Sequence, residues 1–269
     1  MKKTVFAIAL AAAFAAGSAQ AASFVNGGFD GPVAGDAGTT NGWALAGSTQ
    51  RSAVDNANLT PAFVIANASN GGVHSSIISA GTLDPNVATF GSTVYSGNYS
   101  YRVEDTTGGY ASLIQQTVAN YTDANIFFAW KAVLLGAHDA TSSATLKIVL
   151  HNDTTGVDLL TREYNAASGG SGIDPRFSLS GSNYYTAAWQ IEQLPAPAVD
   201  PITGLGDTLT LSVLASDCSP TGHWGYVYLD GFGSVAPPIG VPEPASLALV
   251  GLGLAGLAAS RRRKGSKSA

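Results

Sequence analysis

The chain has 269 residues, of which 45% are hydrophobic and only 12% are charged, and its formal net charge is −5. Seven of its 13 Lys and Arg residues lie near the two ends, which leaves six basic residues against 17 acidic ones in the body once Glu243 is set aside. An acidic body lacks the basic surface that nucleic-acid binding needs and is repelled by anionic lipid surfaces, so the sequence predicts no nucleic-acid partner.

The N-terminus has the three parts of a secretory signal, MKKTVFAIALAAAFAAGSAQAASF. Two lysines come first, an apolar stretch follows over residues 4–16, and Ala19 and Ala21 form an A-x-A cleavage site. The alternative, an N-terminal membrane helix, is disfavoured because the apolar part is too short to cross about 30 Å of hydrocarbon. We expect residues 1–21 to be a signal peptide that signal peptidase removes.

The body has the two-residue hydrophobic period of β-strands. In TLKIVLHN, for example, Leu146, Ile148 and Leu150 fall on one face. Strands are expected at residues 99–104, 111–118, 125–135, 145–152, 157–164, 187–194, 208–214 and 224–232. Two more short strands are expected near Trp43 and at residues 63–66, in a weakly patterned region. Residues 22–234 are therefore predicted to form one all-β domain, a two-sheet sandwich.

The chain has a single cysteine, Cys218, so it cannot form an intramolecular disulfide. About 220 residues bury enough apolar surface to fold without such a bridge. Cys218 is then either a small buried hydrophobic residue or a thiol able to form an intermolecular bridge.

The mature chain opens with FVNGGFDG, followed by the pair Gly42 and Trp43, and a later stretch, GNYSYRVEDTTGGYASLIQQTV, ends in two glutamines. These stretches resemble galactose-binding-like jelly rolls, a group that includes carbohydrate-binding modules. The resemblance implies a jelly-roll β-sandwich in which Gln115 or Gln116 is buried and the first and last strands are adjacent.

The same resemblance implies a calcium site. Asp30 near the start and Asp230 in YVYLDGFG would then meet around one Ca²⁺, with backbone carbonyls completing the shell. Ca²⁺ accepts six to eight oxygen ligands in irregular geometry, which permits such a site. The alternative is that Asp30 and Asp230 only cap turns beside Gly31 and Gly231.

A second pair of stretches, FFAWKAVLLGAHD and SDCSPTGHWGYVYLDGFG, resembles a widespread secreted bacterial domain. Two departures are that Thr221 replaces a glycine of that pattern and that no second cysteine is present. The residues singled out are His138, Asp217 and His223. They either bind a transition metal or hold a loop in place, and the lack of an H-x-H or H-E-x-x-H spacing favours the structural role.

Carbohydrate binding and catalysis leave different signals. Three tryptophans, Trp43, Trp189 and Trp224, are candidates for stacking on sugar rings, although aromatic residues of a sandwich more often lie in the core. The chain has no G-x-S-x-G and no P-loop motif, and any choice among Glu104, Glu163 and Glu192 as catalytic acids is arbitrary. The sequence therefore predicts a protein that is not an enzyme.

The C-terminus carries the most specific motif, VPEPASLALVGLGLAGLAASRRRKGSKSA. A proline-rich linker at residues 235–241 precedes Pro242, Glu243 and Pro244, and an apolar run over residues 245–259 is followed by a basic cluster. That cluster contains Arg261, Arg262 and Arg263. The apolar run is short for a permanent span, and the arginines hold its end in the cytoplasm.

This arrangement resembles the PEP-CTERM sorting signal of Gram-negative bacteria, which exosortase enzymes recognise. The resemblance implies a sorting signal at residues 242–264, a cytoplasmic tail at 265–269, and transient anchoring of residues 245–259 in the inner membrane. The expected function is that of a non-enzymatic cell-envelope or extracellular-matrix protein with a structural, adhesive or carbohydrate-binding role. Its expected partners are exosortase and extracellular polysaccharide. The alternative is a hydrolase that acts on the polysaccharide of the matrix.

Overall fold

The structure is a computed structural model, which describes residues 24–31, 37–105, 109–123, 125–167, 174–194, 206–220, 222–233 and 236. All of these residues lie in one compact unit, Met1–Pro237, while a second unit, Pro238–Ala269, lies outside the described residues. The predicted signal peptide, the sorting signal and nearly all of the linker also lie outside them, so these domain limits stay predictions. Within the described part, no helix is both long and apolar enough to span a membrane.

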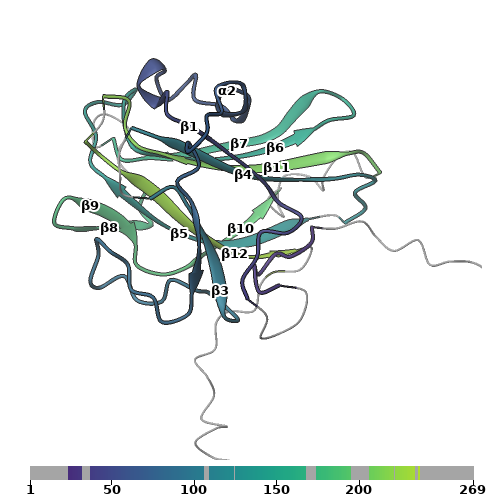
Figure 1. The fold of residues 1–269 in the computed structure, drawn as a ribbon, viewed down its shortest axis with the longest axis horizontal. Coiled ribbons are helices and arrows are strands. Elements are labelled where there is room, and N and C mark those ends of the chain that lie inside the picture. The colour runs from purple at the N-terminus through teal and green to yellow at the C-terminus, as the bar shows by residue number, and fades with distance from the viewer. Residues whose placement is uncertain are drawn as a thin grey trace, which may run out of the picture. The chain divides into compact units, whose positions relative to one another are not determined.

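Two antiparallel sheets make up the described unit (Figure 1). The smaller sheet contains, in spatial order, β1 (Ala44–Ser48), β4 (Ala111–Val118), β11 (Leu209–Ser216), β6 (Thr145–Asn152) and β7 (Val157–Asn165). The larger sheet contains β2 (Ser76–Ser79), β3 (Tyr99–Val103), β12 (Gly225–Gly233), β5 (Ile126–Leu135), β9 (Asn183–Thr186) and β8 (Phe177–Ser180), with β10 (Gln190–Leu194) paired to β5. Consecutive strands lie in different sheets at β1–β2, β3–β4, β4–β5, β5–β6, β7–β8, β10–β11 and β11–β12, and the predicted all-β jelly-roll sandwich is confirmed.

The main core lies between the sheets because alternate side chains of each strand point inward. Leu146, Ile148 and Leu150 of β6 are buried there, as the two-residue period predicts, together with Trp130 of β5 and Leu229 of β12. The intervening residues point to the outer faces of the sheets, where two smaller apolar clusters form.

The outer face of the smaller sheet is covered by the short helix α2 (Pro61–Ala66), which follows a single 3₁₀ turn, η1 (Arg51–Ala53). The Oγ1 atom of Thr60 accepts a hydrogen bond from the amide of Phe63 at 3.1 Å, and Pro61 occupies the first turn. A capping threonine followed by proline starts a helix, so the strand predicted at residues 63–66 is wrong. Figure 1 shows α2 lying outside β1 and β4.

The outer face of the larger sheet carries a second apolar cluster, which we call the aromatic face. Its buried members are Ile78, Val87, Phe90, Val133, Tyr226 and Tyr228. Asp84, in the connection between β2 and β3, accepts hydrogen bonds from the hydroxyls of Tyr226 and Tyr228, both at 3.0 Å. This connection therefore covers part of the sheet and satisfies the tyrosine hydroxyls that would otherwise be buried without partners.

The long predicted strands all exist, but short ones were missed. The strand expected at residues 187–194 begins only at Gln190, and β2, β8 and β9 were not predicted. Each of the missed strands has four residues, which is too short for a two-residue period to stand out. Pairing with a neighbouring strand, rather than local sequence, defines them.

Candidate functional site

The N-terminal segment, residues 24–31, lies against the end of the sandwich. The side-chain amide of Gln116, on β4, accepts a hydrogen bond from the Val25 amide at 2.7 Å and donates one to the Val25 carbonyl at 3.1 Å. Of the two predicted glutamines, Gln116 is thus the buried one. The predicted adjacency of the first and last strands is wrong, because β1 pairs with β4 in one sheet and β12 pairs with β3 and β5 in the other. The N-terminal segment itself contacts the end of β12, where the Phe232 amide donates to the Gly27 carbonyl at 3.0 Å.

Close packing requires glycine in this segment. A Cβ atom on Gly27 would lie 2.0 Å from the carbonyl oxygen of Phe232, so no other residue fits without moving the backbone. A Cβ atom on Gly28 would lie 3.1 Å from Oδ2 of Asp30 and 3.8 Å from Oδ1 of Asp230. The two predicted calcium ligands are therefore neighbours, although 200 positions separate them in the chain.

Each of these carboxylates is also held by backbone amides. Asp230 Oδ2 accepts hydrogen bonds from the amides of Tyr95 and Ser96 at 2.9 and 3.0 Å, and Asp30 Oδ1 accepts one from the Asn98 amide at 2.7 Å. Asp230 is fully buried, and its Oδ1 has no hydrogen-bond partner among the described residues. Capping thus explains only one oxygen of Asp230 and leaves a buried carboxylate oxygen without compensation.

The electrostatics of the pair fit a cation. Burial, assisted by the charge of Asp30, raises the pKa of Asp230 to about 7. A hard divalent ion would remove this penalty, because it binds carboxylate oxygens and tolerates irregular geometry. The residues present therefore fit Ca²⁺, with Asp30 and Asp230 as the carboxylate ligands.

The predicted cluster of His138, Asp217 and His223 is only partly assembled. The Nδ1 atoms of His138 and His223 lie 3.2 Å apart, at the ends of β5 and β12. Asp217 instead faces the backbone: its Oδ2 accepts from the Tyr110 amide at 3.1 Å and its Oδ1 from the Gly225 amide at 3.2 Å. Asp217 is therefore a buried brace of the β11–β12 connection, and its place in the cluster was predicted wrongly.

The neighbour of the two histidines is Cys218, which is fully buried. At this position the sequence predicted only a buried core residue or an intermolecular thiol. Cys218 lies five residues before His223, in the same short connection between β11 and β12. This spacing was the one signal in the sequence that could have placed Cys218 beside His223.

The three candidate sugar-stacking tryptophans separate into two groups. Trp43 is 7% exposed and packs in the main core against Phe24, Phe29 and Phe232, so its ring cannot stack on a ligand, and this prediction is wrong. Trp189 and Trp224 are half-buried and pack against the aromatic face. The two come from different segments and flank the same cluster.

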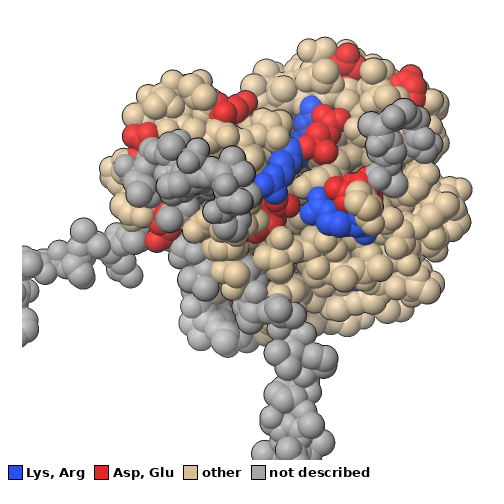
Figure 2. Space-filling model, turned by 180° about the vertical axis from the view of Figure 1, so that it is seen from behind, with Lys and Arg blue, Asp and Glu red and all other residues tan. Residues whose placement is uncertain are grey.

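The nominated catalytic acids do not face each other across an open site. Glu192 is buried, pairs with Arg162, and accepts a hydrogen bond from Trp130 Nε1 at 3.2 Å. Glu163 pairs with Lys147 at 3.2 Å. Figure 2 shows one face of the molecule, on which basic and acidic side chains are adjacent and most of the described surface is uncharged.

Glu104 belongs to a cluster with His74 and Asp105 that the sequence did not predict. It is fully buried with a φ of 66°, and its Oε2 has no hydrogen-bond partner among the described residues. Burial raises its pKa to about 9, with a further contribution from Asp217. Ligand atoms of His74 and Asp105 lie within 4.8 Å of its own and of each other, so this cluster is a second candidate metal site among the described residues.

Arg51 is the other buried residue that the sequence did not reveal. Its guanidinium is fully buried and donates hydrogen bonds to the carbonyls of Val54, Asp217 and Ser143 and to Oδ1 of Asn56, over distances of 2.5–3.2 Å. It thereby ties the η1 turn to the strand end that precedes Cys218. The sequence around Arg51 has no regular spacing of apolar residues, so it did not predict that Arg51 is buried.

Comparison with known proteins identifies one motif. The PEP-CTERM protein-sorting motif matches residues 240–264. No curated protein matches the chain significantly.

Several solved structures are similar to the described unit at low identity. TmCBM61 in complex with beta-1,4-galactotriose shares 10% identity, with a TM-score of 0.40, over 77% of this chain and 93% of that chain. The K1 cleaved adhesin domain of Lys-gingipain from Porphyromonas gingivalis W83 shares 12%, with a TM-score of 0.34, over 72% and 90%. The family 11 carbohydrate-binding module from Clostridium thermocellum shares 8%, with a TM-score of 0.27, over 72% and 89%.

TM-scores this low carry no argument about the ligand of this chain. The motif match has a different standing, because it covers the residues singled out in the sequence, Pro242, Glu243, Pro244 and the arginine cluster. The chain carries a PEP-CTERM sorting motif and is an exported protein that exosortase sorts to the cell envelope.

Proposed function

We propose that this protein is a non-enzymatic component of the cell envelope or extracellular polymer matrix of a Gram-negative bacterium, and that it binds polysaccharide through its aromatic face. The sorting motif at residues 240–264 supports delivery to the envelope. The acidic body supports a neutral rather than a polyanionic ligand, because like charges repel.

One observation carries the carbohydrate part of the proposal. Trp189 and Trp224 are half-buried around one apolar cluster, and Tyr185 of β9, also half-buried, packs against the same cluster. Partly exposed aromatic rings held rigidly by a core beneath them can stack on the apolar faces of sugar rings. Trp189 is held in place by a hydrogen bond from its Nε1 to the Ser92 carbonyl at 3.2 Å and by an edge contact with Tyr95.

Calcium belongs to the same proposal as a structural ion. Ca²⁺ bound by Asp30 and Asp230 would hold the N-terminal segment to β12 and to the loop that contains Tyr95 and Ser96. Because Tyr95 contacts Trp189, the ion would also steady one edge of the aromatic face.

A glycan array probed with the full chain tests the ligand. We expect binding to neutral polysaccharides and a loss of roughly two- to tenfold in affinity for Trp189→Ala or Trp224→Ala, because one stacked ring contributes about 0.5 to 1.5 kcal/mol. Ile65→Ala is the matched control, since Ile65 is 48% exposed on α2 over the other sheet. If no glycan binds, or if the tryptophan variants bind as the parent does, polysaccharide binding by this face is wrong and only the structural role remains.

Cell fractionation tests the sorting part. With Pro242 and Glu243 both replaced by alanine, we expect the chain to accumulate uncleaved in the membrane fraction, because exosortase would no longer recognise the Pro-Glu-Pro step and residues 245–259 would stay inserted. Pro238→Ala, in the linker just before the motif, is the control. Normal release of the double variant would refute processing at this step.

A matrix hydrolase has less support. Glu163 and Glu192 are engaged in ion pairs, and Glu104 is fully buried. Release of reducing sugar from the exopolymer of the producing cell, lost on changing one of these acids, would favour the hydrolase over our proposal.

A further inference from the structure

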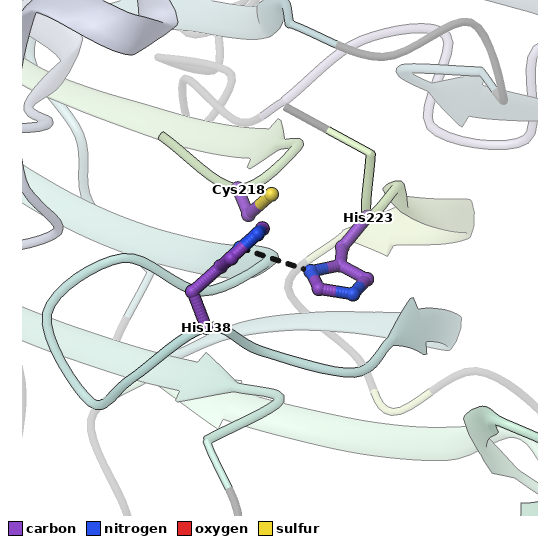
Figure 3. A group of neighbouring side chains, drawn as sticks. All are labelled: His138, Cys218 and His223. Carbon is purple, nitrogen blue, oxygen red and sulfur yellow. Dashed lines mark hydrogen bonds between the residues drawn. The ribbon is translucent and has the colours of Figure 1, made fainter. Parts of the chain in front are cut away.

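Three potential metal ligands converge at one end of the sandwich, from three separate segments (Figure 3). His138 lies just after β5, Cys218 just after β11, and His223 just before β12. Gly136 has a φ of 47°, a conformation that favours glycine, and it bends the chain after β5 beside the His223 ring. Backbone hydrogen bonds from Leu135 to Trp224 and from Cys218 to His223, at 2.8 and 2.9 Å, fix the segments to each other.

The spacing of the ligand atoms fits a tetrahedral metal ion. Zinc binds imidazole nitrogen at about 2.0–2.1 Å and thiolate sulfur at about 2.3 Å, so tetrahedral angles require a separation of about 3.3 Å between two nitrogens. The Nδ1 atoms of His138 and His223 are 3.2 Å apart. One ligand atom from each of the three residues lies within 4.8 Å of the others.

The site is buried on the side of Cys218 and open on the side of His138. His223 is half-buried beside His138, and the two rings are 4.5 Å apart between centroids. Cys218 is fully buried at the base, and burial raises the pKa of its thiol, so a metal ion would have to displace the thiol proton on binding. His138 is exposed, so an ion has a path to the site from solvent.

We propose that His138, Cys218 and His223 bind one Zn²⁺ ion, with water in the fourth position. Two imidazoles and a thiolate suit zinc and exclude calcium and magnesium, which require oxygen ligands. The ion joins the β5–β6 connection to the β11–β12 connection, a cross-link that the single cysteine of this exported chain cannot make by an intramolecular disulfide. The site does not depend on the proposed polysaccharide binding.

Metal analysis of the full chain after equilibrium dialysis against Zn²⁺ tests the proposal. We expect one equivalent of zinc, and an affinity lowered by more than about 100-fold in His138→Ala, because the loss of an outer-shell partner alone costs 10- to 100-fold. His138 is exposed, so this variant should fold even if Cys218→Ser does not. His151→Ala is the matched control, since His151 is a partly exposed histidine of β6 that pairs with Asp158.

Cobalt supplies a readout that a structural role alone would not change. With Co²⁺ bound, the parent should show the intense visible bands of a tetrahedral centre and a sulfur-to-cobalt charge-transfer band, and Cys218→Ser should lose the latter. Binding that survives in His138→Ala, or that is lost in His74→Ala, would place the ion in the cluster of His74, Glu104 and Asp105 and overturn the proposal. A spectrum typical of octahedral Co²⁺, without a charge-transfer band from sulfur, would also overturn the proposal.

Discussion

Removing calcium from the full chain with a chelator is expected to lower its melting temperature by roughly 5 to 10 °C. At a calcium concentration about 100 times the dissociation constant, binding stabilises the folded state by about 2.7 kcal/mol, and about 1 kcal/mol shifts the melting temperature of a domain this size by about 2 to 4 °C. The ion would compensate Asp230, whose Oδ1 is buried without a hydrogen-bond partner among the described residues. Thermal unfolding followed by circular dichroism in calcium and in chelator measures the shift.

The calcium effect should depend on pH in a defined direction. Burial raises the pKa of Asp230 from its usual 3.8 to about 7 in the metal-free folded state. Its contribution to stability is then fully present below the unfolded pKa and is lost as the pH rises through the folded one. The metal-free protein therefore weakens between about pH 4 and pH 7, and the gain in melting temperature on adding calcium should be larger at pH 8 than at pH 6.

Variants separate the metal from the fold. Asp30→Asn should abolish most of the calcium response while keeping a folded protein, because Asp30 is only partly buried. Asp230→Asn should abolish it as well and should raise the stability of the metal-free protein at pH 8, since it removes a buried charge. Asp158→Asn, at a 55% exposed carboxylate of β7, is the control. A response that is unchanged in both site variants would mean that any bound calcium lies elsewhere.

Replacing Arg51 by alanine is expected to destabilise the protein by about 3 to 5 kcal/mol. The change removes a fully buried cation and leaves three carbonyls and the Asn56 side chain without their donor. Each buried acceptor that loses its partner costs about 1 to 3 kcal/mol. Water that enters the cavity would donate hydrogen bonds to some of these acceptors and reduce the total. Urea unfolding at equilibrium, compared at a constant m-value, measures the loss.

The shape of the guanidinium gives this prediction its control. Arg51→Lys keeps the charge but cannot donate to acceptors on several sides at once, so it should be destabilised as well, by less than the alanine variant. Ser52→Ala changes an exposed side chain in the same turn and should be neutral. A loss below about 1 kcal/mol for Arg51→Ala would show that this network contributes little to stability.

The fold follows from local sequence wherever a strand is long. In β6 and β11 every second residue is apolar and buried, so the period alone defines the strand and its inward face. In β2, β8 and β9 four residues carry too little of a pattern, and their pairing with a neighbour decides. At residues 61–66 local chemistry was sufficient but was misread, because Thr60 and Pro61 are a helix start.

By itself, the sequence determined the strand pattern of the body, its acidic charge and the sorting motif, because each depends on residues close together in the chain. Only the tertiary structure decided which distant residues meet. Asp30 lies beside Asp230, and Cys218 replaces Asp217 as the neighbour of His138, while Trp43 lies in the core and Trp189 and Trp224 lie at the surface. These contacts depend on the order of strands in each sheet and on the path of the connections, because strands far apart in sequence bring their loops together at one end of the sandwich. The spacing of apolar residues predicts a strand and its inward face, but it contains no information on strand order or on the path of a loop.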